Sequence, residues 1–157
     1  ALGDALAVAL LEAKGFTAHD FKVFHPGGKL GASLKYVTDL MHKGDEMPLV
    51  AETAAMSEAL VTMTAKSFGC VGVVDAAGKL TGMITDGDLR RHMSGNLLSA
   101  RAADIMTRSP STLKPQTLAP AALEQLNSKK RTQIFVVEDG RPVGILHIHD
   151  LLRAGVA

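Results

Sequence analysis

The chain has 157 residues, of which 46% are hydrophobic and only 4% aromatic. This composition is typical of a soluble globular protein and excludes a disordered chain. Seventeen basic against sixteen acidic residues leave a net charge of +1, so neither nucleic acid nor a membrane is an expected partner. No apolar stretch reaches the roughly 18 residues of a membrane span, and the single cysteine, Cys70, favours a reducing compartment, so a cytoplasmic protein is expected.

Residues 1–36 precede the repeated part of the sequence. Residues 1–14 are apolar on nearly every side of a helix that Gly15 would end, which predicts a helix buried against a larger structure. Residues 17–20 have the pattern of a capping box that starts a short helix, and residues 25–28 predict a rigid turn. Because the chain has no initiator methionine, we interpret it as a piece of a longer protein.

Three blocks of sequence occur twice, in the same order and 62 to 65 residues apart. The paired blocks are Thr38–Met41 with Ala103–Met106, Val71–Asp75 with Ile134–Glu138, and Gly82–Leu89 with Gly144–Leu151. Three matches at a nearly constant spacing indicate an internal duplication, so the fold is expected to contain two similar units.

Each copy predicts the same elements in the same order. A short strand, near residues 49–50 and 112–113, precedes an amphipathic helix, two strands joined by a tight turn, and a final helix. The apolar helix faces are expected to be Met56, Leu60 and Met63 in the first copy and Leu118, Ala122 and Leu126 in the second. One copy is too small to bury both faces of its sheet. The expected fold class is therefore α/β (α+β), with two small three-stranded sheets packed with helices around a pseudo-two-fold axis.

The most specific block is the point where the last strand of each copy enters its final helix. In the first copy Thr85 lies at this junction and Asp88 one turn later. The Thr85 hydroxyl suits either a helix cap or a phosphate oxygen, and the two acceptor oxygens of Asp88 suit a pair of ribose hydroxyls. The alternative interpretation is that the two residues only form a capping box. The second copy keeps Asp150 but has His147 in place of the threonine.

Histidines and arginines surround these junctions. His147 and His149 would share a face of a strand, which suggests metal, but no third ligand is evident, so no metal site is expected. Arg91 and Arg153, with Arg90, follow the two motifs on helix positions that favour either exposure to solvent or a clamp on phosphate or carboxylate.

The order of elements and the Gly82–Asp88 motif resemble a CBS motif, and the tandem pair resembles a Bateman module. The resemblance covers about residues 37–153 and implies CBS motifs at 37–93 and 102–155, joined by a linker at 94–101. It also implies that the threonine contacts phosphate, the aspartate contacts ribose, and strand residues contact the base of a nucleotide.

A second resemblance joins the N-terminal region to the pair. The segments that carry it are residues 1–7, 15–17, 25–28, 86–91 and 147–155. They are similar to arabinose-5-phosphate isomerases, in which a sugar-isomerase (SIS) domain precedes a CBS pair. The family interconverts ribulose 5-phosphate and arabinose 5-phosphate for synthesis of Kdo, a sugar of lipopolysaccharide. The resemblance implies that residues 1–36 are the end of the SIS domain and that His25 is a catalytic residue of the full-length enzyme. The family's catalytic glutamates and lysine lie upstream, so this chain alone is not expected to be an enzyme.

These resemblances imply a regulatory pair that senses a nucleotide and needs no cofactor. The candidate ligand-binding residues are Thr85, Asp86, Asp88, Arg91, His147, His149, Asp150 and Arg153. The ligand suggested by pathway logic is CMP-Kdo, the activated end product, and the rival ligands are AMP, ADP or ATP. The expected partners are a second copy through the CBS helices, the chain's own SIS domain, and a parent homotetramer. The alternative function is a ligand-independent module for dimerisation and assembly.

Overall fold

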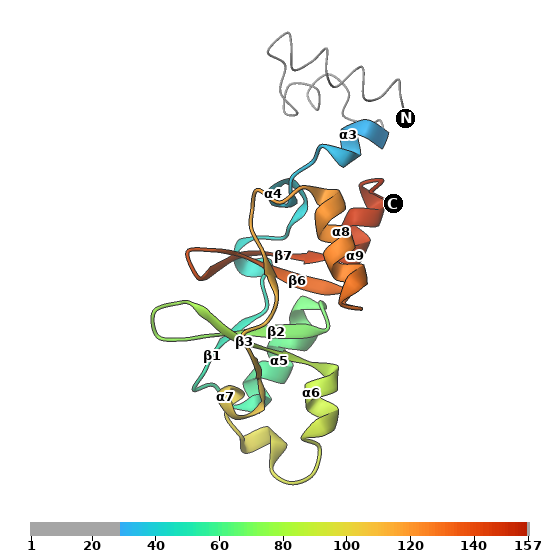
Figure 1. Cartoon of the computed structure of the whole chain (residues 1–157). Helices are drawn as coiled ribbons and strands as arrows, with labels where there is room; N and C mark the ends of the chain where they lie inside the picture. Colours follow the sequence, from blue (N-terminus) through green and yellow to red (C-terminus); the bar gives the residue numbers. More distant parts are fainter. Residues whose placement is uncertain (1–28, 157) are drawn as a thin grey trace.

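The computed structural model describes residues 29–156, and Figure 1 shows two α/β units that follow one another along the molecule. The expectations for residues 1–14, 17–20 and 25–28, including the role of His25, lie outside the described residues. None of the helices in the described part is long and apolar enough to cross a membrane.

Both units have the predicted order of strand, helix, strand, strand and helix. The first unit contains β1 (Leu49–Ala51), α5 (Met56–Lys66), β2 (Cys70–Val74), β3 (Leu80–Thr85) and α6 (Asp86–Arg91). The second contains β5 (Thr112–Leu113), α8 (Ala119–Ser128), β6 (Gln133–Glu138), β7 (Arg141–His147) and α9 (Ile148–Arg153). Short elements connect and flank them: α3 (Lys29–Ser33), α4 (Val37–Leu40), α7 (Ala102–Ile105), β4 (Thr107–Arg108), and the 3-10 helices Gly44–Glu46 and Leu97–Ser99.

The two sheets confirm the predicted α/β class and correct one detail of it. Their strand orders are β1-β2-β3-β4 and β5-β6-β7, so the first sheet has four strands rather than three. The fourth strand, β4, comes from the second repeat and pairs antiparallel with β3. The equivalent segment of the first repeat makes only a single bridge, between His42 and Ile145, because the chain soon turns into the 3-10 helix Gly44–Glu46.

The buried faces of the two amphipathic helices differ slightly from the predicted ones. In α5 the buried residues are Met56, Ala59 and Met63, whereas Leu60 is partly exposed. In α8 they are Ala119, Ala122 and Leu126. Leu118 is 39% exposed because it precedes the helix at the N-cap, so the apolar face begins one residue later than predicted.

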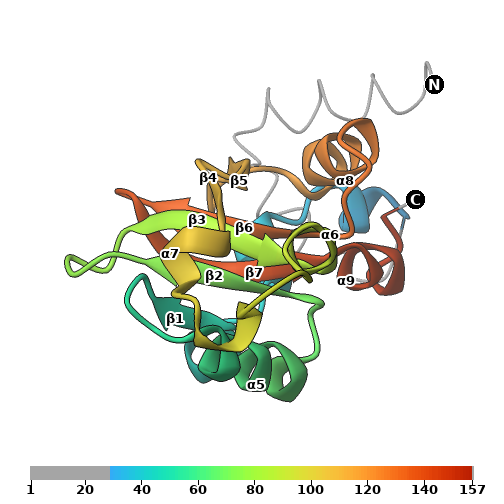
Figure 2. The ribbon, with the colours of Figure 1, turned by 90° about the horizontal axis from the view of Figure 1, so that it is seen from below.

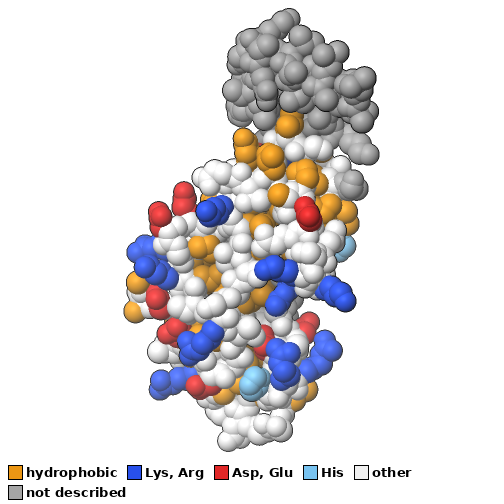
Figure 3. Space-filling model, in the orientation of Figure 1, with side chains coloured by type: hydrophobic (Ala, Val, Ile, Leu, Met, Phe, Trp, Pro, Cys, Tyr) orange, Lys and Arg blue, Asp and Glu red, His pale blue; other side chains and the backbone are white. Residues whose placement is uncertain are grey.

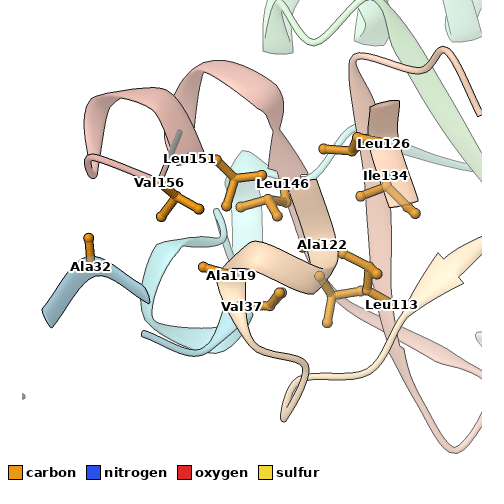
Figure 4. Close-up of a cluster of buried hydrophobic side chains, with 11 residues drawn as sticks. Ala32, Val37, Leu113, Ala119, Ala122, Leu126, Ile134, Leu146, Leu151 and Val156 are labelled. Carbon is orange, nitrogen blue, oxygen red and sulfur yellow. The ribbon is translucent and has the colours of Figure 1, made fainter. Parts of the chain in front are cut away.

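The short helix before each repeat packs into the core of the other repeat. Val37 of α4 is fully buried in the core of the second unit, in one cluster with Ala119, Ala122 and Leu146 (Figure 4). Ala102 and Ile105 of α7 are buried in the core of the first unit. The two units therefore exchange their first helices, and neither core is complete without residues from the other repeat.

This exchange depends on two glycines that leave room for methionines: Gly82 faces Met106, and Gly144 faces Met41. A Cβ atom at Gly144 would lie 2.7 Å from Cγ of Met41 and 3.1 Å from the carbonyl oxygen of His42. We expect Gly144→Ala to lower the free energy of unfolding by about 1–3 kcal/mol, because the added methyl group overpacks this contact. Urea unfolding followed by far-UV circular dichroism measures the change. Gly87→Ala is the control, because Gly87 has no positive φ and a Cβ atom there would meet nothing closer than 3.5 Å. A loss at Gly144 no larger than that at Gly87 would contradict the prediction.

The two sheets meet through a small third core, and β2 and β3 lie beside β6 and β7 in both ribbon views (Figures 1 and 2). Its buried members are Cys70, Met83, Phe135 and Ile145. Cys70 is fully buried, as its apolar sequence context predicts, and this burial raises the pKa of its thiol to about 12. The residue is therefore part of the packing between units and has no reactive thiolate at neutral pH.

Candidate ligand site between the two repeats

The first candidate site lies where β3 enters α6. Thr85 is the N-cap of α6, and its backbone N–H donates to Oδ2 of Asp88 at 2.9 Å. The Thr85 hydroxyl also faces Oδ2 at 3.2 Å, and the two residues form the capping box that the sequence suggests as the alternative role. The carboxylate is therefore held in a fixed orientation by the local backbone.

The other carboxylate oxygen of Asp88 is held by residues that cover it. Oδ1 accepts hydrogen bonds from the Thr107 hydroxyl, at 2.7 Å, and from the Arg91 guanidinium. Asp88 is only 3% exposed, whereas the Arg91 side chain is 64% exposed. Arg91 thus forms an ion pair with Asp88 while most of its side chain remains exposed. A ligand that reaches this carboxylate must replace one of its present donors, and the exposed Arg91 is the easier one to move.

The surroundings of Asp88 favour its charged form. Burial alone would raise the pKa of this carboxyl group, but the hydrogen bonds from Thr107, Thr85 and Arg91 outweigh it and hold the pKa below 3.8. Asp88 is therefore an anion at neutral pH, which makes it a strong acceptor for hydroxyl groups.

The second junction repeats this arrangement with different partners. The backbone N–H of His147 donates to Oδ2 of Asp150 at 2.8 Å, and Arg153 donates to Oδ1 at 2.6 Å. Nε2 of His42, from the first repeat, lies 3.0 Å from the same Oδ1. Burial would raise the pKa of Asp150, but these three hydrogen bonds lower it overall. The His42 imidazole thus takes the place of the Thr107 hydroxyl, while the ring of His147, in the position of Thr85, accepts from the backbone of His149 instead.

His147 and His149 do not share a face of a strand, which corrects the sequence-based expectation. His147 ends β7 and His149 lies in α9, and their rings stack with centroids 4.7 Å apart. Nδ1 of His147 accepts a hydrogen bond from the backbone N–H of His149 at 3.1 Å. Among residues 29–156, no group of three or more histidine, cysteine or acidic side chains is placed to hold a metal ion.

The cap that His147 makes predicts a pH-dependent stability. Burial, together with His149, lowers the pKa of His147 below 6.5, although Asp150 opposes the shift. Below pH 6.5 the unfolded chain therefore binds more protons at this position than the folded chain, so the free energy of unfolding falls as the pH falls toward the lowered pKa. His147→Thr, which restores the residue of the first repeat, is expected to reduce this dependence. Thermal melting at pH 7.5 and 5.5 measures it, and an equal change in both proteins would contradict the prediction.

Two hollows open beside Asp88. A pocket of ≈ 150 Å³, here called the Asp88 pocket, is lined by Met83, Thr85, Asp88, Arg91, Thr107, Pro110 and Arg131. A larger hollow of ≈ 530 Å³, here called the polar cleft, is lined by residues 67–69, 85–87, 90, 130–133 and 147. Thr85 and Arg131 line both hollows, so the two hollows are adjacent. Both hollows use side chains from both repeats.

The polar cleft gathers positive charge. Its walls include Arg90, Lys130 and Arg131, with Asp86 as the acidic residue. By contrast, basic and acidic side chains are interspersed over the face shown in Figure 3. The cleft is therefore a region of local positive charge on a protein whose net charge is only +1.

The structure brings together the predicted residues Thr85, Asp86 and His147 at the polar cleft, and Thr85, Asp88 and Arg91 at the Asp88 pocket. Arg153 forms an ion pair with Asp150 and lines neither hollow. Sequence inspection does not single out Thr107, Lys130, Arg131 or His42. Thr107 and His42 share one signal, since each directly follows the methionine of the first repeated block. Lys130 and Arg131 lie in a turn, and no motif marks them.

Comparisons with known proteins agree with the duplicated fold. A sequence model of the CBS domain matches residues 37–95 and 102–157. The chain is 46% identical over 158 residues to arabinose 5-phosphate isomerase KdsD of Escherichia coli (strain K12), covering 99% of this chain and 48% of that protein. It is 42% identical over 156 residues to the uncharacterized protein RP505 of Rickettsia prowazekii (strain Madrid E), covering 99% of this chain and 49% of the relative. The chain thus spans about half the length of these curated relatives.

A solved structure shows the same architecture. The crystal structure of CBSX2 in complex with AMP superposes with a TM-score of 0.67 at 26% identity, covering 77% of this chain and 96% of that one. The family match covers both repeats, and the structural match covers most of the described fold. The chain therefore belongs to the CBS domain family and carries two CBS domains in tandem.

Proposed function

We propose that this chain is the ligand-sensing CBS pair of an arabinose-5-phosphate isomerase and that it binds a nucleotide at Asp88 without catalysing a reaction itself. The observation that carries the proposal is the ionised, nearly buried carboxylate of Asp88 beside a cleft with three cationic side chains. A carboxylate suits ribose hydroxyls, and arginine and lysine suit phosphate. The AMP complex of CBSX2, at 26% identity, supports a nucleotide as the class of ligand.

The geometry suggests how a nucleotide fits. The Asp88 pocket, at ≈ 150 Å³, is smaller than the roughly 300–1,000 Å³ of typical small-molecule sites, but the neighbouring polar cleft adds ≈ 530 Å³. The ribose hydroxyls donate to Oδ1 of Asp88 in place of Arg91. The phosphate lies in the polar cleft near Arg131 and Thr85, and the released Arg91 is free to pair with a second anionic group.

Among nucleotides, CMP-Kdo matches this set of groups. It combines a ribose and a phosphate with a carboxylate, for which the released Arg91 is suited. It is also the activated end product of the pathway that arabinose 5-phosphate feeds, so its binding would provide feedback. Such feedback requires that the ligand bind two states of the enzyme with different affinity. AMP, ADP and ATP are the rival ligands.

The catalytic half of the proposed enzyme lies outside this chain. The 46% identity to KdsD proteins extends over 99% of the chain but only 48% of their length. We propose that an SIS domain supplies the remaining half, that residues 1–36 belong to its end, and that His25 joins its active site. We also propose that the CBS helices form a homodimer within a homotetrameric parent. Exposed apolar side chains on two of these helices, Val61 of α5 and Leu152 of α9, support such contacts.

Isothermal titration calorimetry of this chain with CMP-Kdo, AMP, ADP and ATP tests the proposal. We expect saturable binding of one of them, and roughly tenfold weaker binding by Arg131→Ala, because a charge-assisted hydrogen bond contributes about 1.5–3 kcal/mol. Arg141→Ala is the matched control, since Arg141 is exposed at the start of β7 and lines neither hollow. No heat with any of the four ligands would reject the sensing function and leave assembly as the alternative.

A further inference from the structure

The two carboxylates of the repeats occupy equivalent positions but have different neighbours. The equivalent pairs are Thr85 and His147, Asp88 and Asp150, Arg91 and Arg153, Thr107 and His42, and Arg131 and Phe68. Around each carboxylate, the residue at the N-cap and the arginine come from the same repeat. The opposite repeat supplies Thr107 and Arg131 near Asp88, and His42, with Phe68 against its ring, at Asp150. The chemical differences between the sites therefore lie mainly in what the opposite repeat contributes.

At Asp150 the opposite repeat contributes a ring that is fixed on several sides. Nε2 of His42 lies 3.0 Å from Oδ1 of Asp150, and Nδ1 lies 3.3 Å from Oε2 of Glu46. The ring meets that of Phe68 edge-on, with centroids 5.1 Å apart. Two backbone hydrogen bonds with Ile145, both 2.9 Å, hold the main chain of His42 in place. The imidazole consequently has little freedom to turn away from the carboxylate.

The same positions at Asp88 hold smaller or more mobile groups. Thr107 contributes only a hydroxyl group, and Arg131 lines an open pocket of ≈ 150 Å³. The exchange of threonine for histidine adds a ring where the first site has space. The exchange of Arg131 for Phe68 removes a positive charge, and Glu46 adds a negative one. A phosphate-bearing ligand therefore meets both steric and electrostatic opposition at Asp150.

We propose that His42, supported by Phe68 and Glu46, closes the Asp150 site, so that each chain binds one nucleotide, at Asp88. This inference rests on the proposed nucleotide-sensing function. It makes the repeat asymmetric in use: one carboxylate binds ligand, and the other joins the two repeats through His42.

Calorimetry of the 157-residue chain with CMP-Kdo, AMP, ADP and ATP counts the sites per chain. The wild type is expected to bind one molecule and His42→Thr two, and adding Asp150→Ala to His42→Thr is expected to return the count to one. Lys43→Thr, an exposed neighbour of His42, is the matched control and should keep one site. His42→Ser, which also removes the ring, takes the place of His42→Thr if that variant does not fold.

The outcomes separate this inference from the proposed function. Two sites in the wild type, or only one site in the folded His42 variant, would overturn the closure. Binding to His42→Thr but not to the wild type would support the closure and refute binding at Asp88. If none of these four titrants binds the wild type or the opened His42 variant, both proposals fail.

Discussion

Replacing Phe135 with alanine is expected to lower the free energy of unfolding by about 3–5 kcal/mol, the usual cost of removing a buried phenylalanine. Phe135 is 1% exposed and belongs to the core cluster between the two sheets. Its ring reaches Gly72 of the first unit, where a Cβ atom would lie 2.7 Å from Cζ of Phe135. The substitution leaves a cavity at the contact that joins the two repeats, and both units lose packing.

Urea unfolding followed by far-UV circular dichroism measures this loss, because the chain has no tryptophan for fluorescence. The control is Met93→Ala, since Met93 is 71% exposed and its removal is expected to change stability by less than about 0.5 kcal/mol. A loss below about 1 kcal/mol at Phe135 would mean that the two repeats do not depend on a shared core. Two separate unfolding transitions in the wild type would lead to the same conclusion.

Replacing Asp88 with alanine is expected to weaken nucleotide binding roughly 10- to 100-fold. The estimate takes about 1.5–3 kcal/mol for a hydrogen bond to a charged group, at about 1.4 kcal/mol per factor of ten. The same change is expected to reduce stability by about 1–3 kcal/mol, because the backbone N–H of Thr85 and the hydroxyl of Thr107 lose their acceptor. Calorimetry measures the first effect and urea unfolding the second.

Asp150→Ala is the matched control for Asp88→Ala. It removes the equivalent carboxylate, which also caps a helix and pairs with an arginine, so its stability cost is similar. Its effect on affinity is expected to be small if the ligand binds at Asp88. Unchanged affinity in Asp88→Ala would reject Asp88 as the ribose contact. Unchanged regulation and oligomeric state of the full-length enzyme with Asp88→Ala would favour the assembly function.

Local sequence patterns predicted most of the units themselves. Alternating and helical periodicities, with turn residues at 75–78 and 138–140, are short-range signals, and they correctly predicted the order of elements in both repeats. The sequence also predicted the capping box of Thr85 and Asp88 as one interpretation, because its partners are three residues apart. The sequence-based prediction was wrong by one residue where the start of a helix determines which side chains are buried. The buried face of α8 begins at Ala119 rather than Leu118, since packing selects which residue starts the helix.

Only the tertiary structure decided which repeat each short helix completes. The segments Thr38–Met41 and Ala103–Met106 carry nearly the same apolar pattern, so either would suit either core by composition alone. The fold places α4 against the second unit and α7 against the first. This exchange carries His42 to Asp150, 108 residues away, and Thr107 to Asp88, 19 residues away.

The sequence by itself thus determined that there are two CBS domains, each with a carboxylate at the start of its last helix, because those features depend on neighbouring residues. The tertiary structure decided what each carboxylate faces. Long-range packing supplies Thr107 and Arg131 beside Asp88, and it supplies His42, backed by Phe68, beside Asp150. The difference between the two sites, one beside an open pocket and one held by a fixed imidazole, follows from side chains that the opposite repeat brings across the interface.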